Sequence, residues 1–361
     1  MRWCRDTSAL DERAIPRCPQ RRCGEAGDTD EMKADAVQKA LPEVLYHYTD
    51  GVGMQGILGP GSGPLQVEIP VDQRSRYNND SDDYTNGKAA RFWASDVRYM
   101  NDSLELRFGA DIVSERLNEA SGDNSLNLDL RVAFAGFAKV FDPARLFSWP
   151  FRCFSVCFCE GNDLLSQWRG YAGGVGGFAI GFPRDVLEIR SHGIQLKAGG
   201  NMFDLPSHAQ LVKIAYGEDA ARERADHLVR QLTQRFDAGR LLLDVDGTPS
   251  MTVAIEAFRT IAGVKHAAFA EEREWRLLAI TDRKLLKTRG RAGGLVPYLD
   301  VVVNSRLGIV PISENPIRQI VVGPTPNQAA QIAAVRDLLE SRGTWIPEDV
   351  DIAPSKAPFL G

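Results

Sequence analysis

Apolar and polar residues change their spacing several times along the chain, and each spacing predicts a different kind of element. Short apolar or alternating runs, typical of strands, occupy residues 44–49, 91–95, 151–160, 178–182, 274–280, 299–303 and 317–323. Apolar residues three or four positions apart, typical of amphipathic helices, occupy residues 102–120, 130–141, 219–236, 251–269 and 325–343. Shorter helices are predicted at residues 51–58 and 163–172, where glycine-rich segments end them.

These elements lack the regular alternation of strand and helix that a doubly wound parallel sheet requires. Their order predicts an α+β fold with a mixed, mainly antiparallel sheet and flanking helices. Residues 1–40 have no periodicity and are predicted to be a disordered tail, residues 41–345 a single α+β domain, and residues 346–361 a C-terminal tail. A polar loop at residues 72–90 is long enough to act as a functional lid.

The composition of the chain limits which partners and which cellular compartment can be expected. The net charge of −5 argues against a surface built throughout for nucleic acid or an anionic membrane. No apolar run approaches bilayer length, and the N-terminus lacks the apolar stretch of a secretory signal, so we expect a cytoplasmic protein with no membrane partner. Cys4, Cys18 and Cys23 lack metal-ligand spacing, so no metal site is predicted and the thiols are expected to be reduced.

The segment EEREWRLLAI contains the strongest local constellation of charged residues. If it is a strand, its period of two places Glu272, Glu274 and Arg276 on one face. Two carboxylates beside an arginine can hold ribose hydroxyls and stabilise a developing positive charge. If the segment is instead a helix end, Glu272 and Arg276 form an ordinary i,i+4 ion pair. The local pattern leaves both interpretations open.

The segment VLYHYT places a histidine on a predicted strand. His47 and Thr49 share one face of that strand, whereas Tyr46 and Tyr48 share the other. A histidine in this position is more often a satisfied structural group than a ligand contact. The strand alone therefore leaves the role of His47 open.

Two further segments place aromatic rings beside polar groups. FWASDVRYMNDSLE carries Trp93 with the polar residues Ser95, Asn101 and Glu105, and SQWRGYA carries Trp168 and Tyr171. Such rings stack on a planar ligand or form the core face of a helix. The sequence contains no phosphate-binding P-loop, nucleophile elbow or HExxH zinc motif.

The motifs LYHYT, FWAS with NDSLE, RCFSVCF, SQWRGYAGG with GFAIGF, HAAFAEEREWRLL and IRQIVVGP occur in this order. This set resembles the bacterial family catalogued as domain of unknown function 2971, over about residues 44–343. The order of the motifs is more specific than any one of them.

More distantly, LYHYTDGVGMQGIL followed by RFWAS resembles the opening of ADP-ribosyltransferases of the His-Tyr-Glu type. The resemblance implies a split antiparallel sheet, with His47 on an NAD ribose hydroxyl and Glu272 or Glu274 at the nicotinamide ribose. Tyr48 stands where that superfamily has glycine, and Phe92, Trp93, Tyr99 and Tyr171 are all candidates for the ring that stacks on nicotinamide. The NAD contacts expected on these grounds are His47, Tyr48, Thr49, Trp93, Ser95, Asn101, Trp168, Tyr171 and Arg276.

Two functional hypotheses follow. The first is an ADP-ribosyltransferase-like enzyme that cleaves NAD and passes ADP-ribose to a protein, a nucleic acid or water, an activity suited to a toxin or an antiphage effector. In it His47 positions the ribose, Glu274 stabilises the cationic sugar and Glu272 orients the acceptor. The alternative is a non-catalytic ligand-binding or regulatory module, in which His47 and the EREWR segment form a structural polar cluster. This alternative predicts that Glu274→Gln destabilises the fold.

Overall fold

The structure is a computed structural model, and its description covers most of the chain after residue 40. The described residues are 41–58, 89–100, 103–149, 151–171, 176–188, 194–198, 201–203, 209–281, 287–291, 294–304, 306–307, 310–311, 315–342 and 347–358. The predicted N-terminal tail, Asn101 and the predicted lid up to residue 88 lie outside them. The chain divides into residues 1–41 and residues 42–361, and every element below belongs to the second unit.

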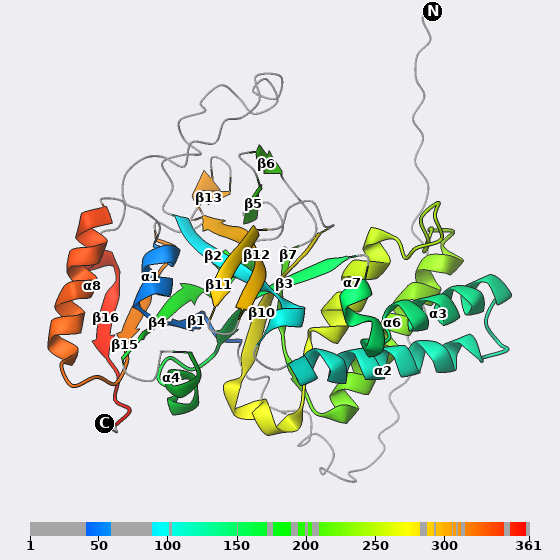
Figure 1. The fold of residues 1–361 in the computed structure, drawn as a ribbon, viewed down its shortest axis with the longest axis horizontal. Coiled ribbons are helices and arrows are strands. Elements are labelled where there is room, and N and C mark those ends of the chain that lie inside the picture. The colour runs from blue at the N-terminus through cyan, green and yellow to red at the C-terminus, as the bar shows by residue number, and fades with distance from the viewer. Residues whose placement is uncertain are drawn as a thin grey trace, which may run out of the picture. The chain divides into compact units, whose positions relative to one another are not determined.

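Helices and strands follow the predicted order, with several additional short strands between them (Figure 1). The helices are α1 (Gly51–Ile57), α2 (Ser103–Ser121), α3 (Leu128–Val140), α4 (Leu165–Tyr171), α5 (Arg184–Glu188), α6 (Glu218–Asp237), α7 (Met251–Ile261) and α8 (Gln328–Arg342). The 3-10 helices are η2 (Val97–Tyr99), η3 (Pro143–Ser148), η4 (Ala267–Glu272) and η6 (Pro347–Asp349). The strands are β1 (Val44–Thr49), β2 (Ala89–Asp96), β3 (Arg152–Cys159), β4 (Phe178–Pro183), β5 (Ile194–Ala198), β6 (Asn201–Phe203), β7 (Ala209–Lys213), β8 (Ala215–Tyr216), β9 (Val264–Lys265), β10 (Glu274–Thr281), β11 (Lys287–Arg291), β12 (Gly294–Asn304), β13 (Arg306–Leu307), β14 (Val310–Pro311), β15 (Gln319–Val322) and β16 (Asp351–Pro354).

Within the described ranges, twelve strands form one sheet whose main path runs β16-β15-β4-β1-β3-β2-β12-β5-β6. Its pairings are antiparallel except for the parallel pair of β15 and β16. The predicted α+β class with a mixed, mainly antiparallel sheet is therefore confirmed. Residues 351–354, which were assigned to a C-terminal tail, form the edge strand β16.

The sheet splits at β3, and this split creates the space for a site. β10 pairs along one whole edge of β3, from Arg152 to Cys159. The other edge is shared, because β1 pairs at Cys159 and β2 pairs at Ser155 and Phe154. Consequently β1 and β2 leave the same edge of β3 in succession and separate from each other.

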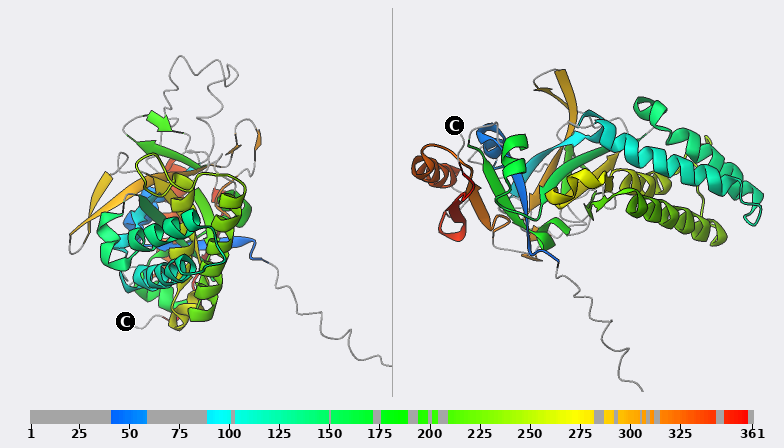
Figure 2. Two further views of the ribbon diagram at one scale, coloured as in Figure 1. Left: turned by 90° about the vertical axis from the view of Figure 1, so that its right-hand side faces the viewer. Right: turned by 90° about the horizontal axis from the view of Figure 1, so that it is seen from below.

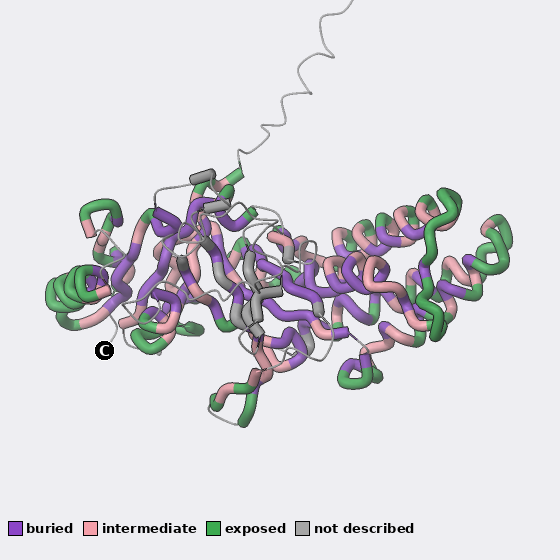
Figure 3. Tube along the Cα trace, turned by 90° about the horizontal axis from the view of Figure 1, so that it is seen from above, coloured by how far each residue is buried: buried purple, intermediate pink, exposed green. Residues whose placement is uncertain are grey.

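The alternation of bulky and small residues in β3 divides the two faces of the sheet, as predicted. Phe154, Val156 and Phe158 belong to an apolar cluster that also contains side chains of α1, α5 and α8. Cys153, one position out of phase, belongs to a different cluster. The strands around β3 are largely buried, whereas α8 exposes its outer surface (Figure 3).

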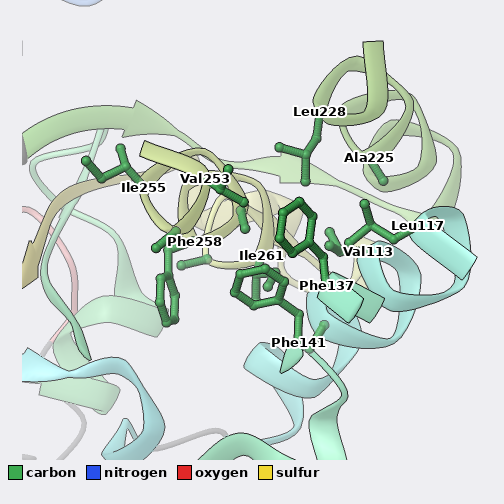
Figure 4. Close-up of a cluster of buried hydrophobic side chains, with 14 of the residues drawn as sticks. Val113, Leu117, Phe137, Phe141, Ala225, Leu228, Val253, Ile255, Phe258 and Ile261 are labelled. Atoms are coloured by element: carbon green, nitrogen blue, oxygen red, sulfur yellow. The ribbon is translucent and has the colours of Figure 1, made fainter. Parts of the chain in front are cut away.

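The second cluster is built by α2, α3, α6 and α7, which gather beside one end of the sheet (Figures 1 and 2). Phe137 of α3 and the C-cap residue Phe141 point toward α7, where Phe141 packs edge-on against Phe258 (Figure 4). Burying a phenylalanine side chain of this kind stabilises a fold by about 1.5–3 kcal/mol. The four helices thus have a core of their own, adjoining the sheet through Cys153 and other buried strand residues.

The predicted helix at 251–269 is too long. The helix α7 ends at Ile261, and the chain then forms β9 and η4 before the next strand. At Gly263 a Cβ atom would lie 2.3 Å from the carbonyl oxygen of Arg259, so a side chain there would clash with the last helical turn. Apolar residues continue at helical spacing beyond Ile261, so the sequence pattern did not indicate the end of the helix.

No helix in the described part of the chain combines the length and apolar character needed to cross a bilayer.

Candidate functional site at the split of the sheet

A cavity of about 560 Å³ opens where β1 and β2 separate, and residues from seven segments line it. This volume lies within the range of small-molecule sites, roughly 300–1,000 Å³. The segments are β1, α1, β2, β3, α4, the η4–β10 junction and β11. The predicted site residues that line the cavity are His47, Tyr48, Thr49, Trp93, Ser95, Tyr171, Glu272 and Glu274.

His47 lies in the split itself. Its Nδ1 is 2.8 Å from the carbonyl oxygen of Cys157, and its ring packs edge-on against Phe92. A carbonyl oxygen only accepts, so Nδ1 carries the proton and Nε2 of the neutral ring is left as an acceptor. Burial lowers the pKa of His47. The hydrogen bond to Cys157 partly offsets this shift, and the charge of Arg289 adds to it. The ring is therefore neutral near pH 7 and can accept a hydrogen bond from a hydroxyl group.

His47 and Glu274 reach the same cavity from opposite faces of the sheet. The register pairs Tyr46 with Cys159 and Cys159 with Glu274, so these three side chains share a face. His47, one position along β1, starts from the other face, and β3 lies between the two strands. The side chains meet one cavity because the split connects the two faces.

Glu274 is the centre of a buried ion-pair network. Arg276 binds it through two bonds, Nε to Oε1 at 2.7 Å and Nη2 to Oε2 at 2.9 Å. Lys265 Nζ lies 3.2 Å from Glu274 Oε2, 2.7 Å from Glu272 Oε2 and 2.6 Å from Glu105 Oε1. Arg276 Nη2 also lies 3.0 Å from Glu105 Oε1. Three carboxylates thus surround two cations, which leaves one formal negative charge beside the cavity.

Glu272 occupies a different position from the one that a strand would give it. It ends η4, Arg273 adopts a left-handed conformation with φ 44°, and β10 begins only at Glu274. Strand β10 therefore starts where the strand predicted at residues 274–280 starts, and Glu272 lies at a helix end, the second of the two interpretations of this segment. Lys265 still brings both carboxylates together. The Glu272 side chain is 16% exposed, against 7% for Glu274. Glu272 is the more accessible carboxylate.

The two carboxylates have opposite pKa shifts. Although burial raises the pKa of Glu274, the charges of Arg276 and Lys265 outweigh it and lower the value to about 2. Burial raises the pKa of Glu272, and the contact with Lys265 only partly offsets this. Glu274 therefore stays ionised through the acidic range, whereas Glu272 takes up a proton more readily.

These shifts predict an acid-labile fold. The stability contributed by Glu274 is fully present above its ordinary pKa of 4.5 and is lost as the pH falls toward 2. We expect the free energy of unfolding to fall by about 2 kcal/mol between pH 7 and pH 3 through this group, with Glu272 offsetting part of the loss. Urea titrations at both pH values measure it. In the Glu274→Gln variant the difference in the free energy of unfolding between pH 7 and pH 3 should be smaller. An equal difference in both proteins would contradict the role given to Glu274.

Two of the predicted NAD contacts have mainly structural roles. The hydroxyl of Tyr48 donates to the carbonyl of Gly161 and accepts from the amide of Leu164, and the residue is 5% exposed. Trp168 donates to Asp163 and packs against the Tyr48 ring, outside the lining of the cavity. These contacts hold α4 against β1.

Arg276 is also absent from the cavity lining. It lies behind Glu274 and donates to the carbonyl of Ala262. Its guanidinium therefore positions Glu274 and does not face the open space.

Two exposed rings of the predicted set remain on the cavity. Trp93 is 41% exposed and Tyr171 is 42% exposed, more than most large rings among the described residues. The pKa of Tyr171 is raised, chiefly by burial of its hydroxyl and also by the charge of Glu274. Tyr171 is thus electrostatically linked to the carboxylates, whereas Trp93 lies beside Arg289.

Sequence reasoning missed Lys265, which pairs with the carboxylates, and Arg289 and Arg291, which line the cavity. Lys265 was placed in the over-long helix. Arg289 and Arg291 lie in KTRGR, a segment without a hydrophobic period that would predict a strand.

Comparison with known families gives one match. Residues 167–277 match the family model described as Protein of unknown function (DUF2971). The DUF2971 match extends from α4 to β10, so it contains Lys265, Glu272 and Glu274 but neither His47 nor β11. No curated protein and no solved structure matches the chain.

Proposed function

We propose that the cavity binds NAD and that the protein cleaves the bond between nicotinamide and ribose, as ADP-ribosyltransferases do. The observation that carries the proposal is the convergence of His47 and Glu272 on one cavity, although 225 positions separate them in the chain. A split antiparallel sheet with a histidine in the split also agrees with an ADP-ribosyltransferase-like fold.

The charges at this end of the cavity suit the substrate. The nicotinamide ring of NAD carries a positive charge, and the departing ring leaves positive charge on the ribose. The network around Lys265 has one more carboxylate than cations, so it favours a cation at Glu272. The exposed ring of Tyr171 lines the same end and offers a face for nicotinamide to stack on.

The contacts of the two glutamates assign them different roles. Glu274 is held by Arg276 and Lys265, so in this proposal it positions the network. Glu272 contacts Lys265 through Oε2 and is the carboxylate that faces the ribose. His47 Nε2 accepts a hydrogen bond from a ribose hydroxyl and fixes the sugar.

In the reaction the bond between ribose C1′ and the nicotinamide nitrogen breaks. Its electron pair leaves with nicotinamide, which becomes neutral, and the ribose develops an oxocarbenium-like charge beside Glu272. A hydroxyl, amine or water then forms the new bond to C1′ and loses its proton to Glu272 or to solvent. The raised pKa of Glu272 suits it to receive that proton.

A second candidate is a non-catalytic module that binds a nucleotide. The buried contacts of Glu274 and Arg276 favour it, because they are those of a structural cluster. In this case the cavity retains its ligand without cleaving it.

Incubating the protein with NAD separates the candidates. We expect nicotinamide to accumulate with time by chromatography, and NAD to bind in calorimetry. Binding without release would favour the non-catalytic module. If NAD neither bound nor released nicotinamide, the proposed function would be wrong.

A further inference from the structure

The opposite end of the cavity carries basic residues that the proposed reaction does not use. Strand β11 has the sequence KTRGR, and its alternation places Arg289 and Arg291 on one face. Through β12, the register brings this face beside Tyr298 and Ser95. The β11–β12 ribbon projects from the sheet (Figure 2), with Arg289 and Arg291 still lining the cavity.

Arg289 is held in place by neutral groups. Its Nη2 donates to Ser95 Oγ at 2.8 Å, and its guanidinium lies 5.5 Å from the centre of the Trp93 ring and 5.9 Å from that of Tyr298. Among the described residues, no carboxylate lies within ion-pair distance of it. Burial lowers the pKa of Arg289, and the charge of Arg291 lowers it further. A preoriented guanidinium therefore faces the cavity with none of the described carboxylates paired to it.

An anion would complete this arrangement. Arginine prefers phosphate and carboxylate groups because its planar fork makes two parallel hydrogen bonds to them. Residues two positions apart on a strand are roughly 7 Å apart at Cα, so both long side chains can reach neighbouring phosphates. Trp93 adds an exposed ring on which a base can stack.

We propose that Arg289, Arg291, Ser95 and Trp93 form a subsite for the diphosphate of a nucleotide. We call these four residues the arginine subsite. Anion binding follows from the arginine subsite alone, whereas its use for NAD rests on the proposed function. The arginine subsite also orients the substrate, because the anionic diphosphate and the cationic nicotinamide prefer opposite ends of the cavity. His47 lies within the electrostatic reach of Arg289, between these ends.

The test measures binding of inorganic pyrophosphate and of ADP-ribose by calorimetry at low salt. Arg289→Gln and Arg291→Gln should each raise the dissociation constants of both ligands by about ten- to a hundredfold, since each removes charge-assisted hydrogen bonds. Arg230→Gln is the matched control, because Arg230 is exposed on α6 and outside the cavity. Melting temperatures establish that each variant is folded, and Arg289→Lys provides a second probe that keeps the charge but loses the fork.

The outcomes separate the two proposals. Weaker binding in Arg289→Gln with unchanged binding in Arg230→Gln supports the arginine subsite, whether or not NAD is cleaved. NAD cleavage by a protein that binds neither pyrophosphate nor ADP-ribose would overturn the arginine subsite and leave the proposed function standing. If binding weakened equally in all three glutamine variants, the loss would reflect the net charge of the protein, and the arginine subsite would also be overturned.

Discussion

Glu272→Gln is expected to slow nicotinamide release from NAD by a factor of about 10² to 10³, the usual loss when a preoriented electrostatic group is removed. The fold should tolerate the change. Lys265 retains Glu105 at 2.6 Å and Glu274 at 3.2 Å, so no buried cation is left unpaired. We expect the free energy of unfolding to change by less than about 1 kcal/mol.

The matched control is Glu271→Gln, because Glu271 is the preceding residue, exposed and outside the cavity. Nicotinamide release by both variants and the parent is followed by chromatography under the same conditions, with urea unfolding as the check on stability. A Glu272→Gln protein that releases nicotinamide at the parent rate would remove Glu272 from the mechanism.

Glu274→Gln is expected to have the opposite profile, with a large effect on stability. Arg276 is 3% exposed and would lose its anionic bidentate partner, because a Gln side chain offers one acceptor oxygen and no charge. Removing one member of a buried ion pair typically costs about 3–5 kcal/mol when the other charge is left without compensation. Arg276 keeps Glu105 Oε1 at 3.0 Å, so the lower end of that range, about 3 kcal/mol, applies here. We expect the free energy of unfolding at pH 7 to fall by that amount.

Glu256→Gln provides the comparison, because Glu256 pairs with Arg259 in a more exposed i,i+3 contact on α7. That change should cost less than about 1 kcal/mol. Equal losses in the two variants, measured by urea unfolding, would show that the network around Glu274 is not the stabilising element described here.

The strand of His47 could be predicted because its information is local. The alternation of VLYHYT predicts β1, and Asp50 begins α1 by accepting from the amide of Gly53. The difference between the two faces of β3 could also be predicted, because bulky and small residues alternate without interruption. The hydrophobic period and the capping residue were sufficient to predict these elements.

The environment of the glutamates could not be predicted from local pattern. Glu105 and Lys265 are 160 positions apart, and only the packing of α2 against β9 brings them together. The left-handed Arg273 converts a continuous-looking EEREWR strand into a 3-10 helix followed by a strand. Such a reversal at a non-glycine residue has no signal in hydrophobic spacing.

The register explains why a single-strand argument could not settle the role of His47. On β1 alone, His47 starts from the face opposite Glu274, which would separate the two residues. The shared edge of β3 opens a passage between the faces, and this depends on how β1 and β2 pair. The site is therefore a property of the topology and not of one motif.

A crystal structure of the Glu272→Gln protein with NAD tests the central claim most directly, because a slowed variant retains its uncleaved substrate. We predict the nicotinamide ribose in the split, with a hydroxyl about 3 Å from His47 Nε2 and the ribose beside residue 272. The diphosphate should lie toward Arg289. NAD bound away from the split, or a ribose contacting neither His47 nor residue 272, would contradict the account.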